Sequence, residues 1–269
     1  MQRAQVSFAP FPVADNLPYM TTRVCFTMDN LGDAADLGRG VINVPRLPGE
    51  RPALEIGFPA LLDMYRRFDI KITHFVEGWS ADAYPECIAR VLADGHTLGM
   101  HGWQHELWPS LDYDQALDIA ARATEAIERN GARPTAFRAP GGKRTRFTSE
   151  ILTDLGYTID SSLCPSGQDG GEICQLTKTL WSAPWEWVGV DASHWLWQKK
   201  DNATVEKDWL QTLDSAADKG KYVLFIWHPH VMGIDPGRLA VGERILEHVT
   251  GNDGFEILTL EQLIGADKK

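Results

Sequence analysis

Residues 71–106, KITHFVEGWSADAYPECIARVLADGHTLGMHGWQHE, decide the fold that the sequence predicts. An apolar run at 71–76 is followed by helical spacing over 83–95, which ends in a glycine, and then by a second strand-like run at 96–100. Glycine commonly follows the last turn of a helix. The stretch therefore predicts a strand, a helix and a second strand, which together form the repeating unit of a parallel sheet.

The same alternation extends along the rest of the chain. Further strand-like runs lie at 23–27, 135–139, 157–161, 221–227 and 255–259. Further helical spacing covers 58–68, 113–131, 148–156, 204–220 and 242–251. No linker rich in Pro, Gly or Ser and no internal repeat divides the sequence. We therefore predict an α/β fold of βα units around a parallel sheet or barrel, in one domain over residues 1–269.

Composition argues against two classes of partner. The formal net charge of -11 disfavours nucleic acid, because proteins that bind it concentrate Lys and Arg against the phosphates. No segment approaches the roughly 18 continuous apolar residues of a membrane span. The first twenty residues also lack the basic stretch and apolar run of an export signal. We expect a cytoplasmic protein that binds neither nucleic acid nor membrane.

Four cysteines, Cys25, Cys87, Cys164 and Cys174, form no C-x-x-C pair, so the sequence indicates neither a zinc ribbon nor a thioredoxin-like site. Buried reduced thiols are expected. The sequence leaves open whether Cys164 and Cys174 are bridged.

Two irregular regions are candidates for the walls of a pocket. The segment from Gly32 to Pro52 is predicted to be a long loop, and in α/β barrels the loops after strands carry the site. Five tryptophans lie within a short later stretch, either as packing residues or as a substrate platform: Trp181, Trp185, Trp187, Trp195 and Trp197. In the same stretch, Asp191 or Glu186 is a candidate for selecting a cationic or hydrogen-bonding substrate.

His101 and His105 follow the strand-like run at 96–100. Their i, i+4 spacing brings two imidazoles together if the segment turns helically, as a divalent metal site requires. Asp29, at the end of the first strand-like run, is a possible third ligand. Each residue alone is also typical of an ordinary polar surface or turn position.

Two further strand ends carry residues with suitable chemistry. His228 follows the apolar run at 221–227, where an imidazole can act as a general acid or base. Arg138 precedes a Pro-Gly-Gly turn, where a guanidinium can brace a carboxylate or bind an anion. The alternatives are a buried structural histidine and a structural ion pair. Four strand ends that each offer a reactive group favour a barrel enzyme.

Six motifs in order resemble those of the polysaccharide deacetylase superfamily. They are TMDN at 27–30, ITHFVEGWSADAYPE at 72–86, DGHTLGMHGWQHE at 94–106, FRAPGG at 137–142, LGYTIDSSL at 155–163 and IWHPHVMG at 226–233. The chain is most similar to a cytoplasmic branch that includes peptidoglycan-deacetylase-like imidases and metal-independent allantoinases. The resemblance implies a distorted (β/α) barrel of about seven strands that hydrolyses linear or cyclic amides.

The resemblance also implies a divalent metal, with zinc the expected ion, held by Asp29, His101 and His105. The motif R-x-P-x-G carries over with Arg138 as a catalytic residue and with Pro140 and Gly142 at the substrate.

His228 carries over as the group that protonates the leaving nitrogen. Trp185 and Asp191 complete the predicted substrate-binding set.

The first motif departs from the family pattern and can be aligned in two registers. In one, Asp29 is the general base and Asn30 replaces the metal-binding aspartate, which weakens or abolishes metal binding. In the other, Asp29 is the metal ligand and Thr27 stands where the base is expected, with Glu106 as a replacement. In both registers the motif has one aspartate where the family has two, so either the general base or the metal-binding aspartate is missing.

We expect an amidohydrolase that acts on a non-peptide carbon–nitrogen bond of a small molecule, using metal-activated water and His228 as the acid. Two alternatives stay open. One is a polysaccharide or peptidoglycan N-deacetylase with a glycan amide as substrate, and the other is a binding protein that lost catalysis. Analogy with relatives suggests a symmetric homo-oligomer.

Overall fold

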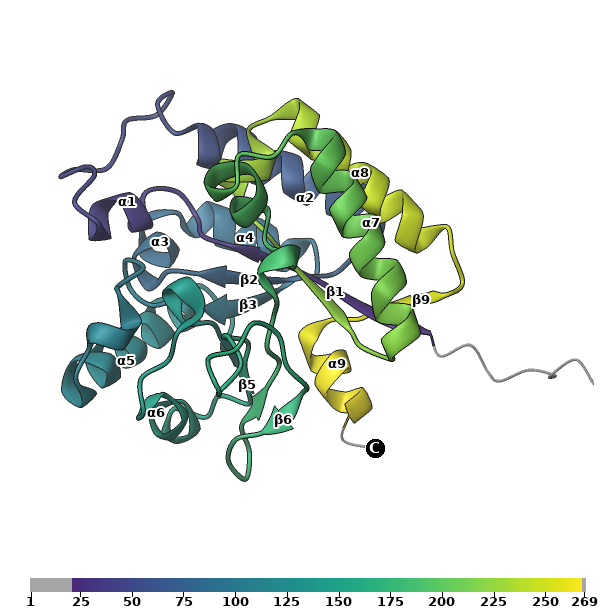
Figure 1. Cartoon of the computed structure of the whole chain (residues 1–269). Coiled ribbons are helices and arrows are strands. Elements are labelled where there is room, and N and C mark those ends of the chain that lie inside the picture. The colour runs from purple at the N-terminus through teal and green to yellow at the C-terminus, as the bar shows by residue number, and fades with distance from the viewer. Residues whose placement is uncertain (1–20, 268–269) are drawn as a thin grey trace, which may run out of the picture.

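A curled sheet of nine strands forms the centre of the structure, a computed structural model that describes residues 21–267. Eight strands follow the order β6-β7-β5-β4-β3-β2-β1-β8, and β9 pairs with β1. Figure 1 shows β1, β2 and β3 at the centre of the molecule. All pairs are parallel except β6 with β7. The strands are β1 (Thr22–Asp29), β2 (Thr73–Val76), β3 (Thr97–Met100), β4 (Ala136–Phe137), β5 (Ile159–Asp160), β6 (Cys174–Gln175), β7 (Trp181–Ser182), β8 (Val223–Trp227) and β9 (Phe255–Ile257).

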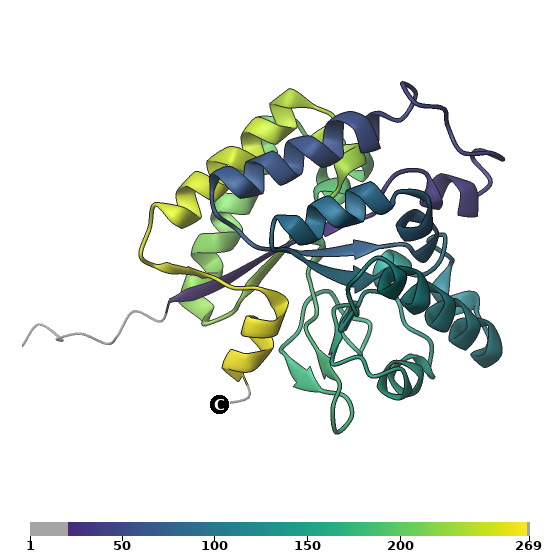
Figure 2. The ribbon, with the colours of Figure 1, turned by 180° about the vertical axis from the view of Figure 1, so that it is seen from behind.

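Helices follow most of the strands and lie on the outside of the sheet, as the view from behind also shows (Figure 2). The α-helices are α1 (Ala34–Gly38), α2 (Phe58–Arg67), α3 (Gly78–Ala83), α4 (Pro85–Ala93), α5 (Tyr113–Arg129), α6 (Thr148–Asp154), α7 (Asn202–Lys219), α8 (Pro236–Thr250) and α9 (Leu260–Asp267). Three short π-helical turns cover 53–57, 193–197 and 229–233.

The predicted α/β fold is confirmed, and each of the seven strand-like runs forms a strand of the sheet. The prediction missed β6 and β7, which have two residues each and do not lie within a predicted strand-like run. The equally short β4 and β5 were found because they lie within the strand-like runs at 135–139 and 157–161. A bridge between Val190 and Ile226 joins the segment after β7 to β8. The sheet therefore curls toward closure as a distorted barrel.

The predicted helices form with small shifts at their ends, and the caps explain the largest shift. Asp235 accepts hydrogen bonds from the backbone N–H groups of Gly237 and Arg238, so α8 begins at Pro236 rather than at 242. The end of α7 is set by Gly220, whose φ of 62° suits a residue without a Cβ atom.

The segment Gly32 to Pro52 differs from its prediction, because α1 forms at its start. Beyond α1 the segment is irregular, and Arg46 anchors it by ion pairs to Asp33 at 2.6 Å and to Asp36 at 2.5 Å. The side chain of Asp33 also accepts a hydrogen bond from the backbone N–H of Arg46. The insert, as residues 32–52 are called below, is therefore anchored to α1 and to Asp33 by its own charges.

The structure bears on two further expectations. Within residues 21–267, no helix combines the length and the apolar character that crossing a membrane requires. The expectation that residues 1–20 carry no export signal lies outside the described residues.

All four cysteines are free thiols, and only Cys25 is fully buried.

Aromatic residues between α7 and the sheet fill much of the core. Trp209 of α7 is fully buried and packs edge-on against Phe225 and stacks against Trp227, both from β8. Its indole N–H donates a 2.7 Å hydrogen bond to the carbonyl of Val188. The helix is thus fixed to the strand that carries His228 at its end.

We expect the Trp209→Ala variant to lower the free energy of unfolding by about 3–5 kcal/mol, because it opens a cavity in the core and removes one of the two hydrogen bonds at the carbonyl of Val188, which also pairs with His194. Urea denaturation followed by circular dichroism measures the change. Trp197→Ala is the control, since Trp197 is 60% exposed and its loss should stay within about 0.5 kcal/mol. Equal losses in the two variants would contradict this account of the core.

Candidate active site

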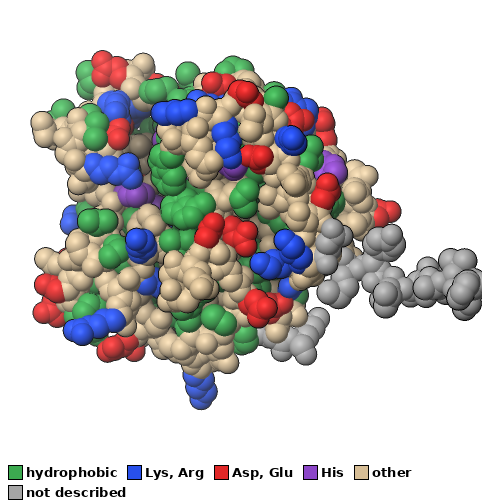
Figure 3. All heavy atoms as spheres, viewed as in Figure 1, with side chains coloured by type: hydrophobic (Ala, Val, Ile, Leu, Met, Phe, Trp, Pro, Cys, Tyr) green, Lys and Arg blue, Asp and Glu red, His purple; other side chains and the backbone are tan. Residues whose placement is uncertain are grey.

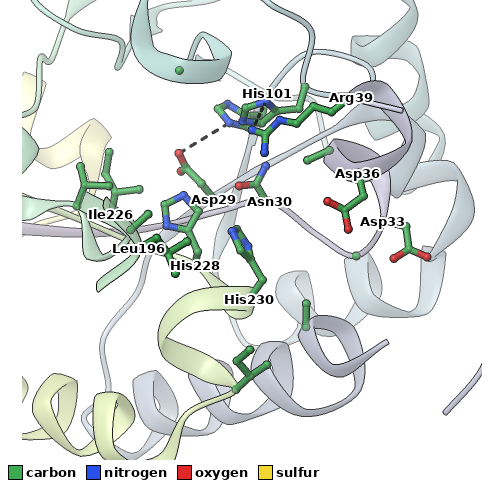
Figure 4. A pocket seen from close by; sticks show the side chains of 18 of the residues that line it. Asp29, Asn30, Asp33, Asp36, Arg39, His101, Leu196, Ile226, His228 and His230 are labelled. Carbon is green, nitrogen blue, oxygen red and sulfur yellow. Dashed lines mark hydrogen bonds and ion pairs between the residues drawn. The ribbon is translucent and has the colours of Figure 1, made fainter. Parts of the chain in front are cut away.

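Four predicted site residues meet at the carboxyl ends of four strands. Asp29 ends β1, His101 follows β3, Arg138 follows β4 and His228 follows β8. They line a pocket of about 520 Å³ together with His105 (Figure 4). Parallel strands present their carboxyl ends at the same edge of a barrel, so residues distant in sequence converge there.

Arg138 is fully buried and fixes Asp29. Its Nη1 donates to Oδ1 of Asp29 at 2.5 Å and to the hydroxyl of Thr27 at 2.9 Å. Its Nε and Nη2 donate to the carbonyl and hydroxyl oxygens of Ser161. Oδ1 of Asp29 is thereby neutralised, and Oδ2 is directed toward His101 at 3.9 Å.

His101 presents a hydrogen-bond acceptor to Asp29. Its Nδ1 lies 2.8 Å from the carbonyl oxygen of Arg138, which can only accept, so Nδ1 carries a proton. Burial, the largest cause, lowers the pKa of His101 to about 3, so the ring is neutral and Nε2 keeps a lone pair. Nε2 of His101 and Oδ2 of Asp29 are therefore two acceptors that face each other 3.9 Å apart.

The turn between His101 and His105 is not helical, contrary to the expectation from their spacing. Gly102 has a φ of 76°, and a Cβ atom there would meet the carboxylate of Glu106. His105 itself has a φ of 62°, which is uncommon for a residue with a side chain. The two rings still come together, with centroids 4.9 Å apart.

His105 accepts a hydrogen bond from the insert. Nη2 of Arg39 lies 3.2 Å from Nδ1 of His105, and a guanidinium only donates. Burial, followed by the nearby His101 and Arg39, lowers the pKa of His105 to about 2. The ring is neutral and carries its proton on Nε2.

His228 forms a dyad with Asp191. Nδ1 of His228 lies 2.5 Å from Oδ1 of Asp191, whose Oδ2 accepts the backbone N–H of His228 at 2.8 Å. Burial lowers the pKa of His228, but the charge and hydrogen bond of Asp191 outweigh burial and raise it above its usual value. Asp191 is fully buried and does not line the pocket, which argues for a positioning role rather than contact with the substrate.

Asn30, the residue that departs from the family pattern, is bound to a buried carboxylate. Its Nδ2 donates to Oε1 of Glu77 at 2.5 Å, and the backbone N–H of Leu31 donates to Oε2 at 3.1 Å. Glu77 is fully buried. An aspartate at position 30 would set two carboxylates against each other without a cation, so this environment favours an amide.

The two alternative bases have other partners. Thr27 is fully buried, and its hydroxyl donates to the carbonyl of Phe225. Glu106 accepts the backbone N–H groups of Trp103 and Gln104 at 2.9 and 2.7 Å, and so shapes the turn that carries His105. Both arrangements argue against proton abstraction by these groups.

The walls of the pocket combine the insert with the tryptophan stretch. Trp185, Trp187 and Trp197 line the pocket, and Trp187 packs edge-on against the other two. Residues of the insert also line it. In the space-filling view, hydrophobic side chains gather beside histidine on this face of the molecule (Figure 3).

The remaining predicted residues are divided between the pocket and the core. Gly142 lines the pocket, whereas Pro140 and Trp181 are absent from its lining. Glu186 lies at a second, separate pocket.

Among the pocket residues that sequence reasoning did not name, Arg39 and His230 contact predicted site histidines. The ring of His230 lies 5.2 Å from that of His228, and burial lowers its pKa to about 3. The H-P-H spacing of these two histidines was the available signal for His230.

The donor groups do not fit a divalent metal as arranged. Within residues 21–267, no three His, Cys, Asp or Glu side chains are placed to hold a metal ion. Two ligands of a tetrahedral zinc at about 2.0–2.1 Å lie about 3.3 Å apart, closer than the 3.9 Å between His101 and Asp29. Arg39 binds Nδ1 of His105, and Arg138 binds Oδ1 of Asp29, which leaves Oδ2 as the one free carboxylate oxygen of Asp29. The geometry therefore does not support the expected zinc at Asp29, His101 and His105.

Glu77 makes stability depend on pH. Burial, the largest cause, raises its pKa to about 7, against the hydrogen bonds of Asn30 and Leu31, which lower it. The folded state thus holds a proton that the unfolded state releases near pH 4.5. This contribution to stability is complete below pH 4.5 and disappears as pH rises through about 7.

We expect Glu77→Gln to flatten the decline of unfolding free energy between pH 5 and pH 8, because glutamine does not titrate. Each unit of pKa difference corresponds to about 1.4 kcal/mol. Urea midpoints at several pH values measure the slope, and parallel curves for the variant and the wild type would refute the prediction.

The chain is similar in sequence to known deacetylases. A family model described as polysaccharide deacetylase matches residues 53–159. The peptidoglycan deacetylase of Helicobacter pylori is 23% identical over 243 residues, which cover 78% of this chain and 83% of that protein. The chain spans only 21–45% of the length of seven further curated relatives.

Solved structures share the fold over nearly the whole chain. A Mycobacterium smegmatis protein assigned to the polysaccharide deacetylases superposes with a TM-score of 0.80 and 24% identity, covering 97% of this chain and 96% of its own. The PuuE allantoinase superposes with a TM-score of 0.75 and 18% identity, covering 97% of each chain. One fold thus carries proteins named for two reactions.

Proposed function

We propose that the chain, which is similar to polysaccharide deacetylases, hydrolyses a non-peptide carbon–nitrogen bond in a small-molecule amide or cyclic imide. The observation that carries the proposal is that one pocket holds both a proton acceptor and a proton donor. Asp29 offers a carboxylate oxygen, and the His228–Asp191 dyad offers a proton. Amide hydrolysis needs both a base for water and an acid for the departing nitrogen.

The size of the pocket favours a small substrate. A volume of about 520 Å³ is in the range of sites that enclose one small molecule. Both the insert and three tryptophans contribute to its lining. The aromatic side suits the apolar part of an amide or a flat imide ring.

Water is the nucleophile, and two acceptors hold it. A water molecule between Oδ2 of Asp29 and Nε2 of His101 donates one hydrogen bond to each and turns a lone pair toward the substrate carbonyl. Asp29 takes the proton as the oxygen attacks the carbonyl carbon. Arg138 keeps the carboxylate in place during this step.

The tetrahedral intermediate collapses when His228 donates its proton to the nitrogen. The carbon–nitrogen bond then breaks, leaving a carboxylic acid and an amine, or one ring-opened molecule if the substrate is an imide. The proton on Asp29 returns to His228 through solvent, which restores the starting state. No step is assigned to a metal ion, because the donor groups do not fit one.

The dyad predicts a shift in the pH profile. His228 must be protonated to act as an acid, so activity falls as pH rises through its pKa, which Asp191 raises. We expect Asp191→Asn to move this alkaline limb of kcat/KM to lower pH by roughly one unit or more. An unshifted limb in a folded Asp191→Asn protein would exclude His228 as the acid.

A substrate panel tests the reaction class. We expect ring opening of cyclic imides or cleavage of acylated amines, and His228→Asn should reduce kcat by about 10²–10⁴-fold. Release of acetate from chito-oligosaccharides or peptidoglycan fragments would instead support an N-deacetylase, the activity named for the Helicobacter pylori relative. Tight binding without turnover across the panel would indicate a protein that lost catalysis.

The domain range 1–269, a cytoplasmic location and a homo-oligomer remain proposals.

A further inference from the structure

We infer that the hydrogen bond from Arg39 leaves the proton of His105 on Nε2, and that this N–H group donates a hydrogen bond to the oxyanion of the tetrahedral intermediate. An N–H group then stabilises the oxyanion where relatives would use a metal ion. The inference rests on the proposed amide hydrolysis. His105 is the catalytic residue in this account, and Arg39 is the residue that positions it. The mechanism above leaves the oxyanion without a partner, and His105 lines the same pocket as Asp29 and His228.

The hydrogen-bond chemistry fixes the tautomer. Nη2 of Arg39 donates to Nδ1 of His105 at 3.2 Å, because a guanidinium has no lone pair to accept with. A neutral ring that accepts at Nδ1 must carry its proton on Nε2. A histidine that binds a metal through Nε2 needs the opposite tautomer, usually held by an acceptor at Nδ1. His101 has such an acceptor in the carbonyl of Arg138, and His105 has a cation instead.

The backbone brings Arg39 to this place. A Cβ atom on Gly38 would lie 2.0 Å from the carbonyl oxygen of Gln104, so the end of α1 rests directly against the turn that carries His105. The ion pairs of Arg46 with Asp33 and Asp36 hold the rest of the insert over α1. His105 is held at a φ of 62°, a conformation that persists only where its surroundings impose it.

The charges next to His105 agree with an oxyanion. Arg39 contacts His105 and Arg138 contacts Asp29, so a guanidinium lies beside each of these two groups. The lining as a whole is balanced, because it holds four arginines and four carboxylates: Arg39, Arg46, Arg51 and Arg138, and Asp29, Asp33, Asp36 and Glu50. The local cation at His105, rather than a net charge of the pocket, therefore favours a developing oxyanion over a divalent metal at this position.

Metal binding tests the inference without any assay of activity. Zn²⁺ and Co²⁺ are titrated into metal-free protein by calorimetry, and Co²⁺ also by absorption. We expect no stoichiometric binding in the wild type. Arg39→Met should bind at least about tenfold more tightly, because Nδ1 is freed and a cation is lost.

Arg51→Met is the matched control, since Arg51 also lines the pocket but pairs with Glu55. It should bind metal as weakly as the wild type. Stoichiometric binding by the wild type that is lost in His105→Gln, or no gain in Arg39→Met, would overturn the inference.

A second measurement reads the tautomer directly. Long-range ¹⁵N–¹H correlation of the histidine rings should show a protonated Nε2 and a bare Nδ1 for His105 near neutral pH. A protonated Nδ1 would overturn the inference. Both measurements remain valid if no amide substrate is found, so failure of the proposed function is distinguishable from failure of this role.

Conservative replacement tests the donor role once a substrate is known. Glutamine keeps an N–H group near the position of Nε2, whereas leucine removes it. We expect His105→Gln to retain at least about tenfold more kcat than His105→Leu, within the 10²–10³-fold that one oxyanion donor contributes. Equal losses in the two variants, with both proteins folded, would refute donation by His105.

Discussion

The side chain of Arg138 joins the carboxyl ends of three strands, and the positions of the candidate catalytic groups depend on that junction. It binds Asp29 from β1 and Ser161 just after β5, while its own backbone follows β4. Its carbonyl oxygen also orients His101. One residue thereby fixes the carboxylate of Asp29 and the imidazole of His101, which face each other 3.9 Å apart.

Burying a guanidinium is unfavourable unless its donors are satisfied, and here they are. Nε, Nη1 and Nη2 all donate to oxygen atoms, one of which carries a charge. A buried pair of this kind is poor evidence for stability, since apolar residues often serve as well. The pair instead fixes the geometry of the site, because it leaves only Oδ2 of Asp29 free and directs that oxygen toward His101.

The sequence predicted the sheet because the strands carry continuous apolar runs, and it pointed to the candidate site because reactive residues directly follow those runs. The structure brings Asp29, His101, Arg138 and His228, which were chosen in this way, into one pocket. The contact between His228 and Asp191 spans 37 residues, and no local pattern records it. The same holds for Asn30 and Glu77, 47 residues apart, so the departure from the family motif was visible but its cause was not.

The geometry at His105 could not be read from spacing, because the turn is built from positive φ angles rather than from a helix. Arg39 lies in a segment without periodicity, so nothing in the sequence marked it as a neighbour of His105.

The contact between Gly38 and Gln104 has an evolutionary consequence. A single methyl group at position 38 would push α1 away from the turn and separate Arg39 from His105. A lineage could therefore gain or lose the guanidinium at this imidazole through a residue that touches neither substrate nor catalytic group. In a barrel of this kind, the distance between the end of α1 and the turn at Gln104 can therefore decide whether a metal ion or an N–H group stabilises the oxyanion.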